Sequence, residues 1–386
     1  MKSGSLSMWK VKREVWRLLN QGDYLVHRVF GRSLIHTYTR VFVDRKVQFL
    51  KGDLPRGTRV AVYLIFPTEG LLASHRIALR YITKSGYAPV VVSNLPLPPE
   101  DLAELKKLCA DLILRPNYGY DFGGYRDAMR LLLPDLNRLD YLAFFNDSSW
   151  FPVRPHLNWL KQGEEMQRDY VGSVCHEGLP AGDFLDFAKT PWVVDTERKD
   201  FHYGSYSLLV GPRLLSSNTF AEFWRRFCPT SIKSFTIRRG EIGLARWVID
   251  HGFSHGALCP SDQLDQLLDD LPSDRLREIT INLIDTRNQH MVDLRRSALA
   301  AEQTYRATLR NVILSFVAYR GPAYVLQDFD TRERCGNFIK KSPLSWSRDD
   351  AEATLRILAR FDNPEASVFL REARQIFDAS YGSREA

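Results

Sequence analysis

RVAVYLIF, at residues 59–66, is a short apolar run rich in β-branched residues, and such a run predicts a buried strand. From this strand onward, helical and extended patterns alternate along the chain. The pattern predicts helices at 71–86, 98–110 and 122–133, and further strands at 89–94, 111–117 and 141–147. Strands that alternate with helices imply a parallel sheet with helices on its faces. The sequence therefore predicts an α/β fold with a mainly parallel sheet.

The rest of the chain divides around this α/β pattern. The middle third is mixed, with expected strands at 170–176 and 202–210 and expected helices at 219–227 and 241–253. Helical patterns dominate from residue 261 to residue 386, notably at 289–317 and 349–378. We therefore expect three parts: an N-terminal helical segment at 1–56, a domain built on the sheet at 57–262, and a mainly helical C-terminal extension at 263–386.

The composition excludes several classes of protein. Of the 386 residues, 44% are hydrophobic and 26% are charged, so the chain is neither disordered nor of low complexity. Five scattered cysteines, never in a Cys-x-x-Cys pair, favour a reducing compartment and argue against a thiolate zinc site. A net charge of +7 suits polyanions such as nucleic acid, anionic lipid and phosphate-bearing substrates. Because no zinc-finger or RNA-recognition signature occurs, we expect no nucleic-acid partner.

Residues 8–19 predict an amphipathic helix near the start of the chain. Met8, Val11 and Val15 share one helical face, whereas Lys10 and Arg13 take the opposite side. Such a helix either lies on an anionic membrane surface or docks on its own domain, and the sequence leaves both open. The segment lacks the continuous apolar core of a secretory signal. No run of about 18 apolar residues occurs in the chain, so we expect no transmembrane helix.

The densest polar cluster, RPNYGYDFGGYRD at residues 115–127, lies between an expected strand and an expected helix. Its glycines permit a tight turn and a close approach of the backbone, and the following helix N-terminus can hold anionic oxygens. The cluster matches neither the Gly-x-Gly-x-x-Gly dinucleotide fingerprint nor a P-loop. The alternative interpretation is an ordinary turn in which Asp121 caps the helix.

Two further acids stand at expected element ends. Asp147, within Asn146-Asp147-Ser148, ends the strand at 141–147, where a carboxylate is well placed to bind Mg²⁺ or Mn²⁺ together with phosphate oxygens. The alternative is that Asp147 caps a turn. Glu241 begins the expected helix at 241–253, and it is a candidate general base or simply a favourable charge at a helix start. No Gly-x-Ser-x-Gly elbow occurs, which argues against an α/β-hydrolase.

These three clusters, in this order, resemble the rhamnan synthesis protein F family, whose members look like glycosyltransferases of bacterial cell-surface polysaccharides. The matching stretches are RPNYGYDFGGYRDAM, YLAFFNDSSWFP, HYGSYSLLVGPRLLSSNTFAEFW and EIGLARWVIDHGF, which with the first strand span about residues 58–260. The same order is similar, more distantly, to the inverting GT-A glycosyltransferases. The resemblance implies a GT-A-like nucleotide-diphospho-sugar transferase fold, with 57–262 as its catalytic domain.

The resemblance also implies roles for single residues. Asp147 takes the position that binds the metal or the diphosphate, with Mn²⁺ or Mg²⁺ as cofactor, and Glu241 takes the position of the catalytic base. The strand ends at 66–69 and 93–94 would border the nucleotide. Trp150, Tyr203 and Tyr206 either stack on sugar faces or simply pack. The expected substrate-binding residues are Arg115, Asn117, Gly119, Asp121, Gly123, Gly124, Arg126, Asn146, Ser148, Trp150 and Tyr203.

The implied reaction moves a sugar, such as rhamnose or another deoxyhexose, from a nucleotide-diphosphate donor to a growing cell-surface polysaccharide or lipopolysaccharide glycan. We expect a lipid-linked acceptor. We also expect a cytoplasmic protein that is peripheral on the inner face of the cytoplasmic membrane, in keeping with the basic charge. Two alternatives remain. One is a non-catalytic scaffold that binds a nucleotide sugar or glycan in a polysaccharide assembly complex, and the other is a nucleotide-sugar hydrolase on the same fold.

Overall fold

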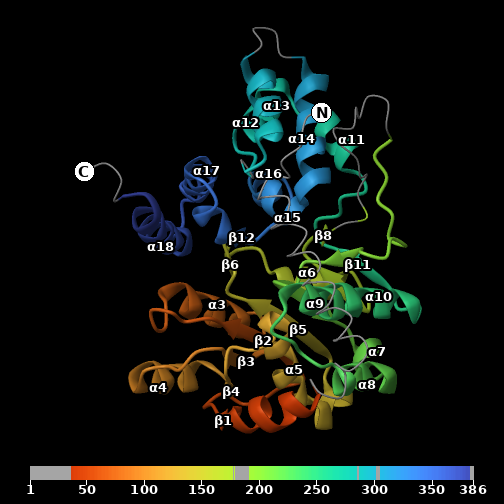
Figure 1. Cartoon of the computed structure of the whole chain (residues 1–386), viewed down its shortest axis with the longest axis vertical. Helices are drawn as coiled ribbons and strands as arrows, with labels where there is room; N and C mark the ends of the chain where they lie inside the picture. The colour runs from red at the N-terminus through yellow and green to blue at the C-terminus, as the bar shows by residue number, and fades with distance from the viewer. Residues whose placement is uncertain (1–35, 177, 179–190, 285–286, 301–304, 383–386) are drawn as a thin grey trace, which may run out of the picture.

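The computed structural model describes residues 36–382, apart from 177, 179–190, 285–286 and 301–304. Figure 1 shows an α/β part that holds the large sheet and a helical part that lies toward one end of it. Two short strands, β6 (Ser149–Trp150) and β12 (Ile339–Lys340), pair with each other where the two parts meet. The chain is therefore a mixed α/β structure with a helical C-terminal region, as the sequence predicts.

One eight-stranded sheet organises the α/β part, in the order β1-β4-β3-β2-β5-β10-β7-β11. Strands β4, β3, β2 and β5 run parallel to one another, and β11 runs parallel to β7. The sheet is thus mainly parallel, as predicted, but β1 and β10 run antiparallel to their neighbours. The strands are β1 Gln48–Lys51, β2 Arg59–Ile65, β3 Ala88–Ser93, β4 Asp111–Leu114, β5 Tyr141–Asn146, β7 Tyr170–Gly172, β10 Ser207–Val210 and β11 His255–Ala257.

Strand β2 shows why this sheet is covered on both faces. Val60 and Val62 pack into one hydrophobic core, which includes residues of α5. Ala61 and Tyr63, which alternate with them, pack into a second core that includes residues of α3 and α4. A strand that is apolar on both faces is stable only between two layers of helices. The covering helices are α3 Ala73–Lys84, α4 Pro99–Leu108 and α5 Tyr120–Leu132.

The elements expected between residues 59 and 147 are all present, with ends that differ by a few residues. The expected strands at 170–176 and 202–210 are each divided in two, because β8 (Cys175–His176) and β9 (His202–Tyr203) leave the main sheet and pair with each other. The other helical elements of this part are η3 Leu133–Arg138, α6 Trp159–Glu165, α7 Pro212–Leu215, α8 Asn218–Arg226, α9 Lys233–Ile237, η4 Arg238–Ile242 and α10 Gly243–Asp250.

The N-terminal segment is only partly described, and the helix expected at 8–19 lies outside the described residues. Two short helical turns, η1 (Thr39–Val43) and η2 (Asp44–Lys46), precede β1. Strand β1 pairs with β4 at the edge of the large sheet. The sheet therefore begins before residue 57, where the sequence pattern placed its start.

The C-terminal region forms two helical groups with separate cores. One core joins α11, α12, α13, α14 and α16, and the other joins α17 and α18 to the β6–β12 pair. The predicted helix at 349–378 is interrupted because Asn363 caps α18, accepting a 2.8 Å hydrogen bond from the Ala366 amide. The elements are α11 Leu264–Asp269, α12 Ser273–Ile281, α13 Gln289–Ala300, α14 Arg306–Arg320, α15 Pro322–Val325, α16 Gln327–Glu333, η5 Ser342–Ser345, α17 Arg348–Leu358 and α18 Pro364–Tyr381.

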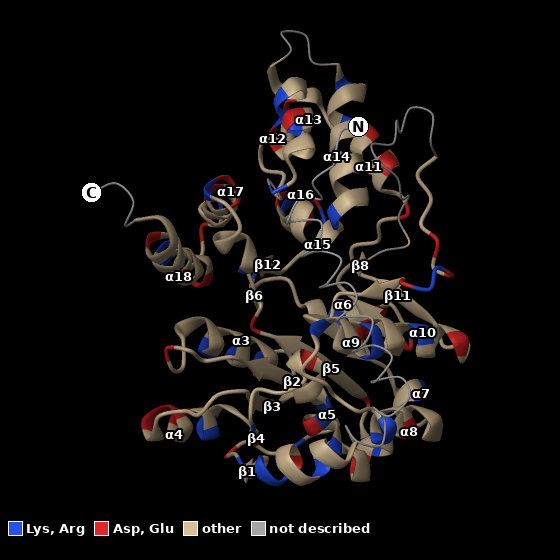
Figure 2. Ribbon diagram, in the orientation of Figure 1, with Lys and Arg blue, Asp and Glu red and all other residues tan. Residues whose placement is uncertain are grey.

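Charged residues of both signs are interspersed over the α/β part and the helical part, as Figure 2 shows. The net charge of +7 is therefore a small excess over many balanced charges. Across the part of the chain that the structure describes, no helix is both long enough and apolar enough to cross a membrane.

Candidate functional site

The sheet reverses its strand order between β2 and β5. From β2 the chain moves through α3, β3, α4 and β4 in one direction, and after α5 it returns to the opposite side of β2 as β5. In open parallel sheets, the crevice outside the carboxyl ends of the strands at such a reversal is where ligands bind. The residues that follow β2 and β5 are therefore expected to line a ligand-binding site.

Asp147 lies at this reversal, directly after β5. Its Oδ2 atom accepts a 2.6 Å hydrogen bond from the amide of Phe66, the residue that follows β2, and lies 3.3 Å from Nε2 of His75. Burial disfavours the charged carboxylate, but His75 and the positive charge of Lys341 favour it more strongly. The pKa of Asp147 therefore lies below its ordinary value, and the group is ionised at neutral pH.

Asn146 connects the end of β5 to α5. Its Nδ2 atom donates a 3.0 Å hydrogen bond to Oδ2 of Asp121, and its Oδ1 atom accepts from the amide of Ser148 at 3.2 Å and from the Ser148 hydroxyl. Asn146 is buried, whereas Ser148 is exposed. The structure thus brings three of the predicted site residues into one hydrogen-bonded group.

Asp121, which belongs to this group, lies in the first turn of α5. It does not cap the helix, because the N-cap residue is Gly119 and no side-chain cap is formed there. Burial and the negative charge of Glu241 raise the pKa of Asp121 to about 7, although the positive charge of Lys340 opposes the shift. A carboxyl group with this pKa can gain or lose a proton near neutral pH.

Glu241 reaches the same place from a different element. The prediction that it begins a helix is wrong, because it lies in the π-helical turn η4, between α9 and α10. Its Oε1 atom accepts a 2.8 Å hydrogen bond from the Ser205 hydroxyl, and its Oε2 atom lies 3.6 Å from Nε2 of His202. Single π-helical turns inside helices occur frequently at functional sites.

Lys340 is the residue of this group that sequence reasoning missed. It lies on β12, in the C-terminal region, and its ammonium group donates a 3.1 Å hydrogen bond to the Ser148 hydroxyl. The ammonium also lies 3.7 Å from the ring centroid of buried Tyr206. Burial lowers the pKa of Lys340 to about 8, while Asp121 and Glu241 oppose that shift. Nothing in the local sequence indicates this placement, because it depends on a pairing with distant β6.

The metal position offers a single carboxylate. Mg²⁺ and Mn²⁺ are bound in many nucleotide sites by one or two carboxylates plus substrate phosphate oxygens, so Asp147 alone fits a metal that the substrate mainly holds. Among the residues that the structure describes, no three His, Cys, Asp or Glu side chains gather as a set that could hold a metal ion.

Arg115 is directed inward. Its Nε atom donates a 2.7 Å hydrogen bond to Oδ2 of Asp127, and its two terminal nitrogens donate to Oδ1 of Asn94 and to the carbonyl of Tyr118. The guanidinium is fully buried and fixes the turn that leads into α5. Arg115 thus supports the turn through contacts inside the protein. Asn117 lies exposed on that turn.

The glycines of this segment are required by close packing within the chain. Gly119 has a φ of 81°, the left-handed conformation that glycine adopts most readily. A β-carbon at Gly124 would lie 2.5 Å from Cδ1 of Leu64, so the missing side chain lets α5 approach β2. A β-carbon at Gly123 would lie 2.3 Å from the carbonyl oxygen of Tyr118.

Arg126 lies apart from the acidic group. It forms a two-pronged ion pair with Asp44 of η2, at 2.6 and 3.1 Å. Together they help to form a shallow pocket of about 430 Å³, which is lined by His36, Arg40, Asp44, Arg45, Arg126 and Arg130. The structure therefore places this arginine in a basic pocket at the N-terminal edge of the described chain.

Two of the expected stacking residues are buried within the protein. The indole nitrogen of Trp150 donates a 2.9 Å hydrogen bond to Glu372 of α18. The Tyr203 hydroxyl lies 2.6 Å from Nδ1 of His255, and its ring packs against other aromatic rings of the core. Both rings contribute to packing, and neither belongs to the hydrogen-bonded group around Asn146.

Solved structures of residues 1–349 of TarS from S. aureus have a weak likeness to this chain. The complex with UDP-GlcNAc is 12% identical, and the match covers 84% of this chain and 89% of that chain with a TM-score of 0.31. The complex with UDP is 11% identical over the same shares, with a TM-score of 0.29. A TM-score of this size supports no conclusion about fold or function.

Sequence comparison gives a clearer result. The uncharacterized protein y4gN of Sinorhizobium fredii is 30% identical over 256 residues, which are 66% of this chain and 62% of that relative. The chain thus matches about three fifths of the length of this relative. The sequence model of the family described as rhamnan synthesis protein F matches residues 89–284, half of the chain and the segment that carries Asp121, Asn146, Asp147 and Glu241. The chain therefore belongs to the rhamnan synthesis protein F family.

Proposed function

We propose that the protein is a glycosyltransferase that moves a sugar from a nucleotide-diphosphate donor to a growing cell-surface polysaccharide glycan. The observation that carries this proposal is the group formed by Asp121, Asn146, Asp147 and Glu241 at the strand-order reversal of a parallel sheet. Membership of a family named for rhamnan synthesis supports a polysaccharide product and suggests rhamnose or a related deoxyhexose as the sugar.

In this proposal the donor lies across the carboxyl ends of β2, β3 and β5, as in a GT-A fold. Residues 66–69 and 93–94 border the nucleotide, and Asp147 lies next to the diphosphate. An ionised Asp147 repels a diphosphate unless a cation lies between them. Mn²⁺ or Mg²⁺ held by Asp147 would supply that charge and stabilise the leaving nucleoside diphosphate.

Glu241 is the proposed general base for an inverting transfer. It takes the proton from the acceptor hydroxyl as that oxygen forms a bond to the anomeric carbon. The bond between the anomeric carbon and the phosphate oxygen breaks on the opposite side, and the nucleoside diphosphate leaves with the electron pair. The hydrogen bond from Ser205 holds one carboxylate oxygen of Glu241 in a fixed orientation. Asp121, with a pKa of about 7, is the second group suited to this proton transfer.

We also propose a peripheral position on the inner face of the cytoplasmic membrane, where a lipid-linked acceptor would be located. The support lies in residues 38–46, which include η1 and η2 and carry both exposed aromatic and exposed basic side chains. Tyr38 and Phe42 expose 49% and 57% of their surface, and Arg40 and Arg45 lie exposed beside them. Aromatic and basic groups together favour an anionic membrane surface.

Calorimetric binding of UDP, GDP and dTDP, each with Mn²⁺ and again with EDTA, tests the donor site. Binding of one nucleotide that is lost with EDTA and in Asp147→Ala would support a metal-dependent transferase and identify the donor class. Binding that survives EDTA would keep the donor site and remove the metal. If none of the three nucleotides binds, the proposed donor site is wrong.

The hydrolase alternative needs a separate measurement. A transferase releases nucleoside diphosphate from its sugar donor in proportion to glycan acceptor, whereas a hydrolase releases it without acceptor. Release that does not change when membrane-derived lipid-linked glycan is added would contradict the transferase.

A further inference from the structure

We infer that Lys340, supplied by the C-terminal helical region, binds the diphosphate of the donor in this site. The inference rests on the proposed function and adds a residue to it that lies outside the stretch matched by the family. It assigns the C-terminal region a direct part in substrate binding.

The pairing of β12 with β6 sets the position of Lys340. In the register of this pair, Lys340 lies opposite Ser149, two residues after Asp147. The amide of Lys341 also donates a 2.9 Å hydrogen bond to the Ser148 carbonyl. The side chain of Lys340 is therefore directed to the same strand end where Asn146 and Asp147 lie, as its 3.1 Å hydrogen bond to the Ser148 hydroxyl shows.

The charge of Lys340 has no ion-pair partner in the described structure. The residue is 8% exposed, and no described carboxylate lies within 4.0 Å of its ammonium group. Its close contacts are a hydroxyl and the Tyr206 ring, and the negative charges of Asp121 and Glu241 act on it from farther away. A buried ammonium group without an ion pair costs free energy, so its retention beside a ligand crevice indicates an anionic ligand.

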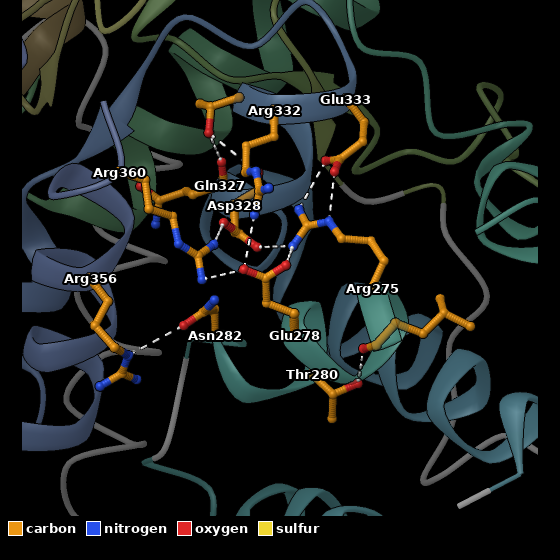
Figure 3. A network of polar contacts seen from close by, with 12 residues as sticks. Arg275, Glu278, Thr280, Asn282, Gln327, Asp328, Arg332, Glu333, Arg356 and Arg360 are labelled. Atoms are coloured by element: carbon orange, nitrogen blue, oxygen red, sulfur yellow. Dashed lines mark hydrogen bonds and ion pairs between the residues drawn. The ribbon is translucent and has the colours of Figure 1, made fainter. Parts of the chain in front are cut away.

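The backbone at Lys340 is held by an extended polar network. The Lys340 amide donates a 2.6 Å hydrogen bond to Oε1 of Gln327, on α16. The next residue, buried Asp328, accepts from Arg275 of α12 at 2.9 Å and from Arg360, which follows α17 (Figure 3). Helix α16 therefore holds the segment that presents Lys340, and Arg275 of α12 and Arg360 in turn hold α16. A side chain supported in this way is preorganised for binding.

The same ammonium group suits the chemistry of the leaving group. When the bond from the anomeric carbon to the phosphate oxygen breaks, negative charge increases on the departing diphosphate. An ammonium within hydrogen-bond distance stabilises that charge without any proton transfer, by direct electrostatic attraction. Lys340 would act together with the metal or in its place, according to whether Asp147 holds one.

The competing explanation is that Lys340 is structural and only holds the Ser148 hydroxyl in place. The two explanations differ in what a charge-preserving substitution does. If Lys340 contacts the diphosphate, Lys340→Arg retains most of the nucleotide affinity, since a guanidinium also binds phosphate, whereas Lys340→Met loses it. A purely structural role predicts that folded Lys340→Met binds nucleotide as the wild type does.

The experiment measures affinity for whichever of UDP, GDP or dTDP binds the wild-type chain. The variants are Lys340→Met, Lys340→Arg and, as matched control, Lys161→Met, which removes an exposed lysine of α6. Circular dichroism and thermal unfolding verify that each variant folds. We expect an affinity loss of about tenfold or more in Lys340→Met, because the variant loses a charged hydrogen bond to the diphosphate. We expect little change in Lys340→Arg and none in the control.

Each outcome is decisive. Equal affinity of folded Lys340→Met and wild type would overturn the role of Lys340 and leave the proposed transferase standing. An equal loss in Lys340→Met and Lys340→Arg would also overturn it, since the site would then need the shape of lysine rather than its charge. If the wild type binds none of the three nucleotides, both proposals fail together. Lys340→Gln, which retains a hydrogen-bond donor for Ser148, replaces the methionine variant if that variant does not fold.

Discussion

Asp121 shows how the surroundings of one side chain set its chemistry. Its carboxyl group is buried at the start of α5, near the charge of Glu241, and its pKa is raised from 3.8 to about 7. In the unfolded chain the same group releases its proton near pH 4. Between these values the folded state holds a proton that the unfolded state does not. This group therefore lowers stability progressively as the pH rises from about 4 to 7.

Asp121→Asn is expected to remove this pH-dependent loss of stability. Asparagine still offers a carbonyl oxygen to Asn146 but carries no charge. The thermal midpoint of the variant should exceed that of the wild type at pH 8 by more than it does at pH 5. The control is Asp274→Asn, which changes an exposed acid of α12. An equal difference at the two pH values would contradict the raised pKa.

Glu241→Gln tests the proposed base. Glutamine keeps a carbonyl oxygen for the Ser205 hydroxyl but cannot take a proton from an acceptor. We expect the rate of acceptor-dependent nucleoside diphosphate release to fall by about a hundredfold or more, with little change in nucleotide affinity. Glu165→Gln, on the exposed side of α6, is the control. If Glu241→Gln keeps the full transfer rate, Glu241 is not the base and another group takes the proton.

The sequence predicts part of this group and not the rest. Asp147 and Asn146 end the strand expected at 141–147, and Asp121 directly precedes the helix expected at 122–133, so the local pattern places all three at the ends of recognisable elements. Lys340 follows no such local rule. Its position depends on which distant strand its two-residue strand joins, and short apolar patterns do not carry that information.

Among the elements, η4 is the one whose form the sequence pattern conceals. The sequence pattern predicts a helix at 241–253 that begins at Glu241, directly after Gly240. In the structure Gly240 lies inside a continuous helical stretch, and its hydrogen atom faces the ring of Phe122. The glycine is needed for close packing against α5, not for a cap.

Gly240→Ala should therefore destabilise the protein. A β-carbon at this position would lie 2.3 Å from Cγ of Phe122, so α5 or η4 must shift to accommodate it. We expect the free energy of unfolding in urea to fall by about 1–3 kcal/mol, as for other overpacked cores. Gly57→Ala, where the nearest atom to a β-carbon is 4.0 Å away, is the matched control. Similar stability of the two variants would contradict the packing argument.

The elements η1 and η2 carry the prediction on membrane binding. We expect the double variant Arg40→Glu and Arg45→Glu to reduce co-sedimentation of the protein with vesicles that contain anionic lipid, because each basic residue near such a surface contributes about 1 kcal/mol. Binding to vesicles of neutral lipid should remain low for both proteins. The double variant Lys107→Glu and Lys161→Glu, at exposed lysines of α4 and α6, changes the net charge by the same amount and serves as the control. Wild-type protein that does not bind anionic vesicles would remove the proposed peripheral attachment.

At the scale of the whole molecule, the C-terminal region is joined to the α/β part at defined points. Besides the β6–β12 pair, Glu372 of α18 accepts hydrogen bonds from the Ser74 amide of α3 and from Trp150 of β6, both at 2.9 Å. The helical region is thus attached to the side of the sheet where the candidate site lies. The sequence predicts its helices from their periodicity but gives no indication of these attachments, since each joins residues far apart in the chain.

Asp328→Asn tests whether the polar network of Figure 3 stabilises the molecule. The substitution removes the negative charge that Arg275 and Arg360 share in a mostly buried position. We expect the free energy of unfolding to fall by roughly 2–3 kcal/mol, a value reduced for the partial exposure of Arg360. Urea unfolding of this variant and of Asp274→Asn supplies the comparison. If the network does not stabilise the fold, the urea unfolding curves of Asp328→Asn and Asp274→Asn will be alike.

The β6–β12 pair also has a consequence for the time course of synthesis. The two residues joined by the Lys340–Ser148 hydrogen bond are 192 positions apart in the sequence. The ribosome therefore synthesises Asp121 and Asp147 well before Lys340. At about 5–20 residues per second, this interval lasts on the order of ten seconds or longer. Once Glu241 has also been added, the α/β part carries Asp121, Asp147 and Glu241 while Lys340 is still to be synthesised. A nascent or prematurely terminated chain would therefore lack the ammonium group that we assign to the diphosphate, and it would bind a nucleotide sugar more weakly than the finished polypeptide.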